Sequence, residues 1–556
     1  MEEIMERLKG GQLVVKCLEA QGVQFVFGIP GAKIDTVFDA LEDSSIQLIL
    51  CRHEQNAAFM AQAYGRLTGK PGVVLVTSGP GVSNLATGLL TATTEGDPIV
   101  AIGGNVPRAM ALKESHQNTN NVALMAPVTK SSVEVLMPQT IPEVFANAFR
   151  CATAPRRGAC FISLPQDVLT EQVDAAVIEP LHEIRYGVGH EHTLQAVAHS
   201  INVAQSPVLL LGQEASRPEN TKAIRALLAK THLPTVGTFQ AAGVVPRNLV
   251  SCFAGRVGLF SNQPGDELLR HADLVITVGL NMAEYDPETW NRRKQRTIIH
   301  IDYLPAKIHA AYQPKYELLG DVDANITILT GLLDSAMVSR NDEYVKPYHE
   351  AHQHIIHSGE YLSKGKLLHP LHFIYELRNA LDDEAYVVCD VGSVYMWMAR
   401  YFLSYEPHHL LFSNGQQTLG VGMPWAMAVN FVHPDKRVIS LSGDGGFLFS
   451  AMELENAVRH KQNFVHFIWR DNGYNMVKEQ ELMKYHRGSG VDFGTVNVID
   501  FAKAFGAKGY ELKHPSDFKA LLLEALAQTG PVLVDIPIDY SDNPKLFETM
   551  NASTGN

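Results

Sequence analysis

Short apolar runs rich in β-branched residues alternate with amphipathic segments along most of this 556-residue chain. The run VQFVFGIPG at 23–31 precedes AKIDTVFDALEDS, where apolar residues recur at helical spacing on one face, namely Ile34, Val37, Phe38 and Leu41. The same order returns in IQLILC followed by RHEQNAAFMAQAYGRLTG, and GVVLVTSGPGVSN again leads from a strand through glycines toward a helix. Such alternation is typical of parallel sheets with helices on both faces. It predicts an α/β fold of doubly wound parallel sheets.

Two polar stretches, near 175–192 and 335–365, interrupt this pattern. The apolar runs PVLLLGQEAS, HADLVITVGL and RTIIHIDYLP lie between them, and AYVVCDVGS, RVISLSGDGG, NFVHFIWRDNG and PVLVDIPID follow them. A chain of this length is too long to fold around a single hydrophobic core. We therefore expect three α/β domains, at 1–180, 190–340 and 360–545.

Composition narrows the classes of function. The chain has 46 basic and 59 acidic residues, a net charge of −13 and no Lys/Arg block, so it lacks the basic surface that nucleic-acid binding requires. Its start, MEEIMERLKGGQ, is polar, and no stretch approaches the ~18 apolar residues of a membrane span. Six scattered cysteines without a CxxC pair are typical of reduced thiols. We expect a cytoplasmic protein that binds neither nucleic acid nor membrane.

A group of histidines in YHEAHQHIIH invites a metal-binding interpretation. His349 and Glu350 are followed by His352 and not by a histidine at 353, so the HExxH spacing of zinc enzymes is absent. A solvated linker helix is the favoured interpretation. Ordinary nucleotide-binding loops are also poorly supported, because no GxxxxGK[ST] occurs and GPGVSN lacks the last glycine of GxGxxG.

Two apolar runs end in acidic residues 27 positions apart. RVISLSGDGGF places Asp444 between glycines, and NFVHFIWRDNG ends at Asp471. An isolated Gly-Asp-Gly favours a tight turn, but ligands of open parallel sheets bind at the carboxyl ends of strands, where two such residues can converge. Two carboxylates, a backbone carbonyl and water suit Mg²⁺, and the glycines let the backbone approach a phosphate. The hypothesis is Mg²⁺ bridging a diphosphate.

These residues carry a resemblance to a known family. Gly443-Asp444-Gly445, followed by Asp471-Asn472, is similar to the signature of the thiamine-diphosphate-binding fold. The resemblance implies that Asp444, Asp471 and the carbonyl of Gly473 hold Mg²⁺ beside thiamine diphosphate. The usual signature ends in Asn-Asn, so Asp471 adds a negative charge at its metal-binding place.

The resemblance also implies an acid in the first domain. The aminopyrimidine of the cofactor must tautomerise before its reactive carbon loses a proton, and a glutamate with a pKa raised by burial promotes this. Glu54 in CRHEQNA occupies the matching place after an early strand. Taken alone, the same three residues RHE are more typical of a solvated helix start.

The similarity narrows to acetolactate synthases and covers nearly the whole chain. Its segments are FGIPGAKID, RHEQNAAFMA, LVTSGPGVSNL, EGDPIVAIGGNV, FISLPQDV, SNGQQTLGVGMPWA and DNGYNMV. Within that family the chain most resembles the catabolic, pyruvate-dedicated type. This implies that Gln417 bonds the pyrimidine amino group, that Leu419 bends the cofactor into a V, and that further cofactor contacts come from Gly392, Ser393, Gly445, Gly446 and Met476.

Three residues are expected near the reacting carbon. The resemblance places His116 and Gln117, in KESHQN, in the loop that faces it, with Lys33 close by. Considered without the family, each is more typical of a surface loop. We expect His116, Gln117 and Gln480 to hold the second ketoacid.

Two departures from the biosynthetic branch bear on flavin. Gln480 stands where biosynthetic enzymes carry a tryptophan that favours 2-ketobutyrate, and VGLNMAEYDP lacks their arginine pair, with Tyr285 in the second place. Both differences lie on the flavin-side and substrate-selecting surface. The chain is therefore expected to work without FAD.

The implied reaction condenses two pyruvates to 2-acetolactate and carbon dioxide through a hydroxyethyl-thiamine-diphosphate enamine, for acetoin biosynthesis. The family implies a homodimer as the minimum active unit and a homotetramer made by pairing dimers. Alternatives are an FAD-containing biosynthetic acetohydroxyacid synthase, a pyruvate oxidase, and a non-catalytic α/β binding protein. Glyoxylate carboligase is disfavoured because it lacks the glutamate that Glu54 supplies.

Overall fold

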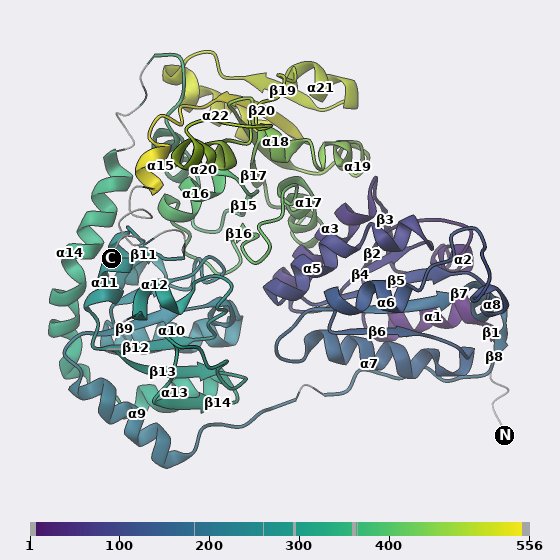
Figure 1. Cartoon of the computed structure of the whole chain (residues 1–556), viewed down its shortest axis with the longest axis horizontal. Coiled ribbons are helices and arrows are strands. Elements are labelled where there is room, and N and C mark those ends of the chain that lie inside the picture. Colours follow the sequence, from purple (N-terminus) through teal and green to yellow (C-terminus); the bar gives the residue numbers. More distant parts are fainter. Residues whose placement is uncertain are drawn as a thin grey trace. The chain divides into compact units, whose positions relative to one another are not determined.

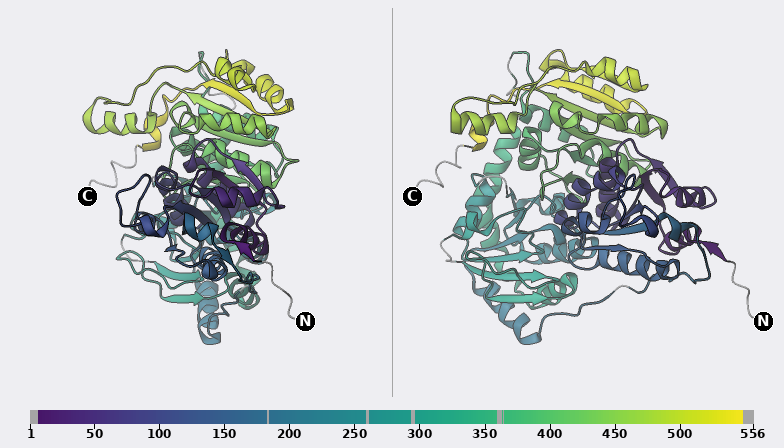
Figure 2. Two further views of the ribbon diagram at one scale, coloured as in Figure 1. Left: turned by 90° about the vertical axis from the view of Figure 1, so that its right-hand side faces the viewer. Right: turned by 45° about the vertical axis from the view of Figure 1, so that its right-hand side comes forward.

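The computed structural model describes residues 7–182, 184–258, 261–292, 296–358, 363 and 365–547. These residues form three six-stranded sheets whose strand pairs are all parallel (Figure 1, Figure 2). Helices alternate with the strands along the chain. The predicted α/β fold of doubly wound parallel sheets is confirmed.

The first sheet has the strand order β3-β2-β4-β5-β7-β6. Its strands are β2 (Phe25–Ile29), β3 (Gln47–Leu50), β4 (Gly72–Val76), β5 (Ile99–Asn105), β6 (Ser131–Glu134) and β7 (Ala159–Pro165). The helices of this part are α1 (Gly10–Ala20), α2 (Asp35–Leu41), α3 (Glu54–Thr68), α4 (Pro80–Ser83), α5 (Ala86–Glu95), α6 (Asn121–Met125), α7 (Ile141–Thr153) and α8 (Gln166–Thr170). A two-stranded antiparallel ribbon joins β1 (Leu8–Lys9) to β8 (Gln172–Val173).

The middle sheet has the order β11-β10-β9-β12-β13-β14. Its strands are β9 (Pro207–Leu211), β10 (Thr235–Gly237), β11 (Phe253–Arg256), β12 (Leu274–Val278), β13 (Thr297–Asp302) and β14 (Tyr316–Leu319). Its helices are α9 (Glu191–Val203), α10 (Pro218–Thr231), α11 (Pro264–His271), α12 (Pro287–Asn291) and α13 (Val322–Leu332), and α14 (Val338–Ser358) follows.

The third sheet, with the order β16-β15-β17-β18-β20-β19, repeats the strand order of the first. Its strands are β15 (Val387–Cys389), β16 (Leu410–Phe412), β17 (Val438–Gly443), β18 (Phe464–Arg470), β19 (Lys508–Glu511) and β20 (Val532–Pro537). Its helices are α15 (Pro370–Ala380), α16 (Ser393–Tyr401), α17 (Gly422–Val432), α18 (Asp444–Phe447), α19 (Leu454–Arg459), α20 (Asn475–Tyr485), α21 (Val498–Phe505) and α22 (Phe518–Ala527).

The central strands of the first sheet are buried on both faces, whereas four edge strands of the three sheets are partly exposed. Every residue of β4, β5 and β7 is buried, as expected for a parallel sheet with helices on both faces. The edge strands β3, β6, β14 and β19 are half-exposed and less apolar. The apolar runs did not indicate β14 and β19, which are half-exposed, or β10, β11 and β16, which are buried but only three or four residues long.

The described residues divide into two compact units. Unit 1 comprises those within Met1–Glu183, Gly415–Asp435 and Ser450–Gln462, and it contains the first sheet. Unit 2 comprises those within Ile184–Asn414, Lys436–Phe449 and Asn463–Asn556, and it contains the other two sheets. Two segments from the part of the chain that forms the third sheet therefore pack with the N-terminal part. They are Gly415–Asp435, which carries α17, and Ser450–Gln462, which carries α19.

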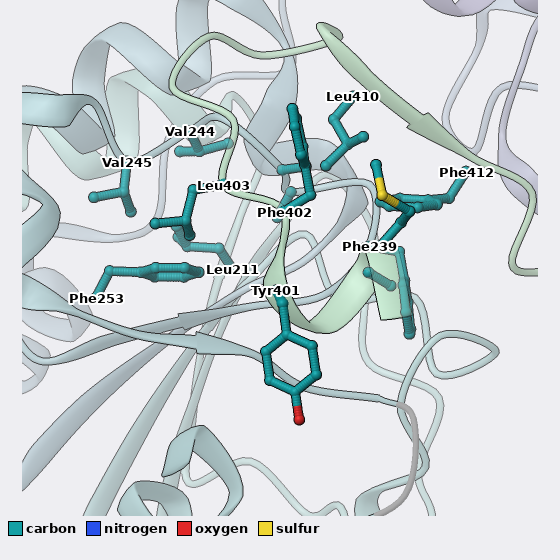
Figure 3. Packing of buried hydrophobic residues seen from close by; sticks show 14 of the residues in the cluster. Leu211, Phe239, Val244, Val245, Phe253, Tyr401, Phe402, Leu403, Leu410 and Phe412 are labelled. Carbon is teal, nitrogen blue, oxygen red and sulfur yellow. The ribbon is translucent and has the colours of Figure 1, made fainter. Parts of the chain in front are cut away.

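One apolar core joins the two sheets of unit 2. Phe239 after β10 stacks on Tyr395 with ring centroids 5.3 Å apart. It also meets Phe412 of β16 edge-on at 6.2 Å, and both of these rings are labelled in Figure 3. The guanidinium of Arg256 lies in the same region and donates to the backbone carbonyls of Ala399 and Phe402. The contacts fix the middle sheet against the third.

The expected linker helix forms, but it is not solvated throughout. Helix α14 carries all four histidines, and His354 and His357 are exposed. His352 of the same helix is buried, and its Nε2 lies 3.1 Å from the carbonyl oxygen of Arg400. The expectation was wrong for this residue, because one face of α14 packs on unit 2.

All six cysteines are free. Within the part of the chain that the structure describes, no helix combines the length and apolar character needed to cross a membrane.

Candidate active site

The carboxyl edge of the third sheet holds the predicted metal ligands. β17 and β18 are neighbours with Gly443 opposite Trp469, so Asp444 and Asp471 emerge side by side from the two strand ends. Asp444 accepts the backbone N–H of Asn472 through Oδ2 at 2.7 Å and that of Gly445 through Oδ1 at 3.0 Å. The structure therefore brings the two carboxylates to one turn.

This edge is also a topological switch point. The chain leaves β15 for β16 on one side and returns to β17 on the other, and open parallel sheets bind ligands outside the strand ends at such a point. Gly392, after β15, is the N-cap of α16 and has φ 131°, a conformation that favours glycine. A Cβ at this position would meet nothing within 4 Å, so the backbone faces open space. Such a helix start suits an anion.

Burial makes both carboxylates costly to ionise. It raises the pKa of Asp444, and burial together with the negative charge of Asp444 raises the pKa of Asp471 to about 7. Two neighbouring carboxylates in this state are what a divalent cation would stabilise. Gly473 is buried in the following turn, where its neighbour Tyr474 donates its N–H to the carbonyl of Val491.

Helix α20 begins beside this turn and carries two more predicted residues. Met476 is half-buried against the core of unit 2, and Gln480, one turn later on the same face, is exposed. Near the helix start, Ser393 and Asn543 donate to Oδ1 of Asn475 at 2.8 and 2.6 Å. Gly445 and Gly446 are buried in α18.

Glu54 is the first residue of α3, at the carboxyl end of β3 in unit 1. It is half-buried, and the side-chain amide of Asn84 donates to its Oε2 at 2.9 Å. The turn before it is held by Glu453, which is fully buried and accepts the backbone N–H groups of Arg52 and His53 at 2.8 and 3.1 Å.

Gln117 lies near the same part of unit 1. Ser78 donates to its Oε1 at 3.4 Å, and a Cβ on Gly79 would lie 3.1 Å from its Cβ, so Gln117 packs on the turn after β4 that leads to Asn84. Lys33 is half-buried and donates to Oε1 of Gln166 at 3.3 Å. His116 is exposed beside a shallow surface hollow.

The segment with Gln417 and Leu419 is seated on α5. Glu95 accepts the backbone N–H of Gly415 at 3.1 Å, Gln416 donates to Thr94 at 2.9 Å, and the hydroxyls of Thr91 and Thr418 lie 2.8 Å apart. Gln417 is exposed and Leu419 half-buried.

A buried ionic cluster lies beneath this segment. Arg66 pairs with Glu95 at 2.5 Å and with Asp97 at 2.6 Å, and its guanidinium lies 4.5 Å from the ring centre of Trp425 on α17. The three charged side chains are almost completely buried. Removing one partner would leave an uncompensated buried charge.

Three predicted site segments adopt an uncommon backbone conformation. Among the described residues, seven other than glycine have a positive φ, and these include Gln117 at 59°, Gln417 at 50° and Asn472 at 61°. Left-handed backbone outside glycine is uncommon and concentrates at functional sites.

The predicted residues fall into two groups. Lys33, Glu54, His116, Gln117, Gln417 and Leu419 lie in unit 1, and Gly392, Ser393, Asp444, Gly445, Gly446, Asp471, Gly473, Met476 and Gln480 lie in unit 2. Sequence reasoning missed four supporting side chains, namely Asn84, Glu95, Glu453 and Asn475. For Glu453 one signal was available, because it is a charged residue inside the apolar-spaced segment SAMELENAV.

Comparison with known proteins agrees with this geometry. The model of the thiamine pyrophosphate enzyme N-terminal TPP binding domain matches residues 8–124, that of the central domain matches 194–329, and that of the C-terminal TPP binding domain matches 390–536. These matches include Glu54, Asp444 and Asp471.

Whole-chain relatives narrow the family. The acetolactate synthase of Bacillus subtilis (strain 168) is 51% identical over 97% of this chain and 94% of its own length. The catabolic acetolactate synthase of Raoultella terrigena is 44% identical over 98% and 97%. The acetolactate synthase isozyme 1 large subunit of Escherichia coli (strain K12) is 31% identical over 97% and 95%. The resemblance inferred from the motifs is confirmed, and the chain belongs to the acetolactate synthase family of thiamine pyrophosphate enzymes.

Proposed function

We propose that the chain is a catabolic acetolactate synthase, a carboligase that joins two pyruvates into 2-acetolactate with release of carbon dioxide. The observation that carries this proposal is the 44% identity with the Raoultella terrigena protein, named catabolic, over 98% of the chain. The carboxylate pair at the switch point supports it, because that edge suits a diphosphate with its cation.

The residues at the third sheet fit the two groups that the family implies. Asp444, Asp471 and the carbonyl of Gly473 would hold Mg²⁺, and their chemistry suits it because all the donors are oxygens. The diphosphate would lie at the start of α16, against Gly392, Ser393, Gly445 and Gly446. When bound, thiamine diphosphate supplies the nucleophilic carbon and the electron sink for decarboxylation.

In unit 1 the proposed roles concern the pyrimidine and the substrates. Oε2 of Glu54 accepts a hydrogen bond from Asn84, so we assign the proton exchange with the pyrimidine to Oε1. Gln417 would accept from the pyrimidine amino group, and Leu419 and Met476 would supply apolar contacts to the cofactor. Glu453 and Glu95 position these segments through their backbone N–H groups.

The second pyruvate needs polar partners that exclude water. We assign this role to Gln117, whose Oε1 is already oriented by Ser78, together with His116 and Gln480. Lys33 would act nearby as a positive charge for the carboxylate of the substrate.

The proposed enzyme works without FAD. In the middle domain the order of the strands puts a switch point between β9 and β12, where a dinucleotide would ordinarily bind. The loops after these strands approach each other closely, because a Cβ on Gly212 would lie 2.4 Å from the carbonyl oxygen of Gly279. Tyr285, in the place of an arginine, is buried and donates to Asp266 at 2.5 Å. Both observations support a middle domain in which these loops and Tyr285 contact other parts of the same domain.

Domain boundaries, assembly and location complete the proposal. The domains are 1–180, 190–340 and 360–545, and each range contains one family-model match. The minimum active unit is a homodimer, and dimers pair into a homotetramer by closed symmetry. Six free cysteines suit a reducing cytoplasm.

The test is an incubation of the purified protein with pyruvate, Mg²⁺ and thiamine diphosphate, with and without FAD. We expect carbon dioxide, acetoin after acidification, the same rate in both arms, and no flavin absorbance of the protein. A protein that releases no carbon dioxide would contradict the proposal, and a rate that depends on FAD would favour the biosynthetic or oxidase alternative.

A further inference from the structure

Three side chains of different chemistry converge in the middle domain. The ring nitrogen of His232, the thiol of Cys252 and a carboxylate oxygen of Asp342 all lie within 4.8 Å of one another. His232 caps the C-terminal end of α10, Cys252 ends the short 3-10 helix Arg247–Cys252, and Asp342 lies in the first turns of α14. They come from three separate segments, so the cluster results from tertiary packing.

The elements that carry the cluster carry none of the predicted active-site residues. His232 stands shortly before β10 and Cys252 immediately before β11, so both belong to the amino-terminal edge of the middle sheet. Ligands of such sheets bind at the opposite, carboxyl edge. An ion here would act on the structure of unit 2 and not on the reaction.

The cluster lies at the boundary between the core of the middle domain and the solvent. Nδ1 of His232 lies 2.9 Å from Oδ1 of Asp342. Cys252 is fully buried, whereas the side chains of His232 and Asp342 are 31% and 47% exposed.

The donor set selects the kind of ion. Zn²⁺ accepts thiolate, imidazole and carboxylate ligands at about 2.0–2.3 Å, which spaces tetrahedral donors roughly 3.5 Å apart. Contracting distances of at most 4.8 Å to that value requires only small side-chain movements. Mg²⁺ prefers oxygen ligands and would not compete for the sulfur.

We propose that His232, Cys252 and Asp342 bind Zn²⁺ with a water as fourth ligand, and so tie the start of α14 to the end of α10. Binding releases the thiol proton to solvent. The neighbouring Asn341 already donates to the carbonyl of Thr231 at 2.8 Å, which holds the two helices in register without the ion.

The experiment uses the full chain with thiamine diphosphate and excess Mg²⁺, after removal of transition metals with a chelator. Titration with Co²⁺ as a spectroscopic substitute should produce a thiolate-to-cobalt absorption band that saturates at one equivalent. The band should vanish in Cys252→Ser and persist in Cys151→Ser, the cysteine control. Zn²⁺ should raise the unfolding temperature in proportion to the logarithm of its concentration.

Asp342→Asn keeps the proposal testable if Cys252→Ser does not fold. This variant should weaken Zn²⁺ binding at least roughly tenfold, while Glu343→Gln, which removes the same charge from the adjacent exposed residue, should not. Acetolactate formation should be equal with and without Zn²⁺. The absence of a thiolate band in the unaltered protein, or equal Zn²⁺ affinity of the two acidic variants, would overturn the assignment.

Discussion

Oδ2 of Asp444 accepts the backbone N–H of Asn472 at 2.7 Å. This bond joins the ends of β17 and β18 and sets the turn that begins with Asp471. Asp444 therefore has two tasks, as a proposed metal ligand and as the acceptor that shapes the turn.

Asp444→Asn should harm Mg²⁺ binding more than Asp471→Asn. An asparagine at 471 matches the usual family signature, whereas an asparagine at 444 cannot accept both N–H groups that Asp444 now accepts. Loss of such a bond to a charged acceptor corresponds to roughly a ten- to hundredfold change. The check is the Mg²⁺ concentration for half-maximal activity at saturating thiamine diphosphate. Equal effects of the two substitutions would argue against the double task of Asp444.

Glu54→Gln should reduce turnover by roughly two to four orders of magnitude, because the amide cannot exchange the proton. Its Oε1 can still accept from Asn84, so the unfolding temperature and the Mg²⁺ requirement should remain close to those of the unaltered protein. Glu143→Gln, on an exposed position of α7, is the control and should keep full turnover. Full activity of Glu54→Gln would refute the assignment of the acid.

The hydroxyl pair Thr91–Thr418 offers a test of how the Gln417 segment is held. Thr418→Val removes one hydroxyl at nearly constant volume and should destabilise the ordered conformation of the Gln417 segment by about 1 kcal/mol. The expected result is a several-fold weaker thiamine diphosphate affinity with little change in turnover. Thr91→Val also removes the hydrogen bond that Thr91 donates to the carbonyl of Thr87, so it should weaken the affinity at least as much. The double variant should be no worse than Thr91→Val alone, since the contact between the two hydroxyls is already lost there. Additive effects would show that the 2.8 Å contact is unimportant.

His352 should make the protein less stable in acid. Burial lowers its pKa from 6.5 to about 4, so the folded protein holds it neutral while the unfolded chain takes up a proton. Neutral His352 therefore makes its full contribution to the free energy of unfolding above pH 6.5. This contribution, roughly 3 kcal/mol in total, is lost as the pH falls toward 4.

The measurement compares unfolding temperatures of the unaltered protein and His352→Gln at pH 7 and pH 5. Glutamine can still donate to the Arg400 carbonyl but does not titrate, so acidification should lower its unfolding temperature less. The buried His466 is present in both proteins, and its contribution cancels. A parallel decline of the two proteins would exclude His352 as a source of acid sensitivity.

Several features could be predicted because they depend on local patterns. Continuous apolar runs indicated the inner strands and period-3.6 spacing the helices. The acidic residues that follow RVISLSG and NFVHFIWR lie next to each other once the two strands pair in parallel. The half-exposed strand β19 escaped, because an edge strand contacts a neighbour on one side only and needs no continuous apolar run. Strand β16 is buried and apolar, but it has only three residues, too few to stand out as a run.

By itself, the sequence determined the α/β alternation, the residues that end the inner strands, and the family to which they point, because each of these depends on near neighbours or on short motifs. Only the tertiary structure decided that Glu453 holds the turn before Glu54, that Glu95 anchors Gly415, and that His352 is buried. These contacts join residues tens to hundreds of positions apart. They depend on which helix faces pack together, and no local spacing encodes that choice.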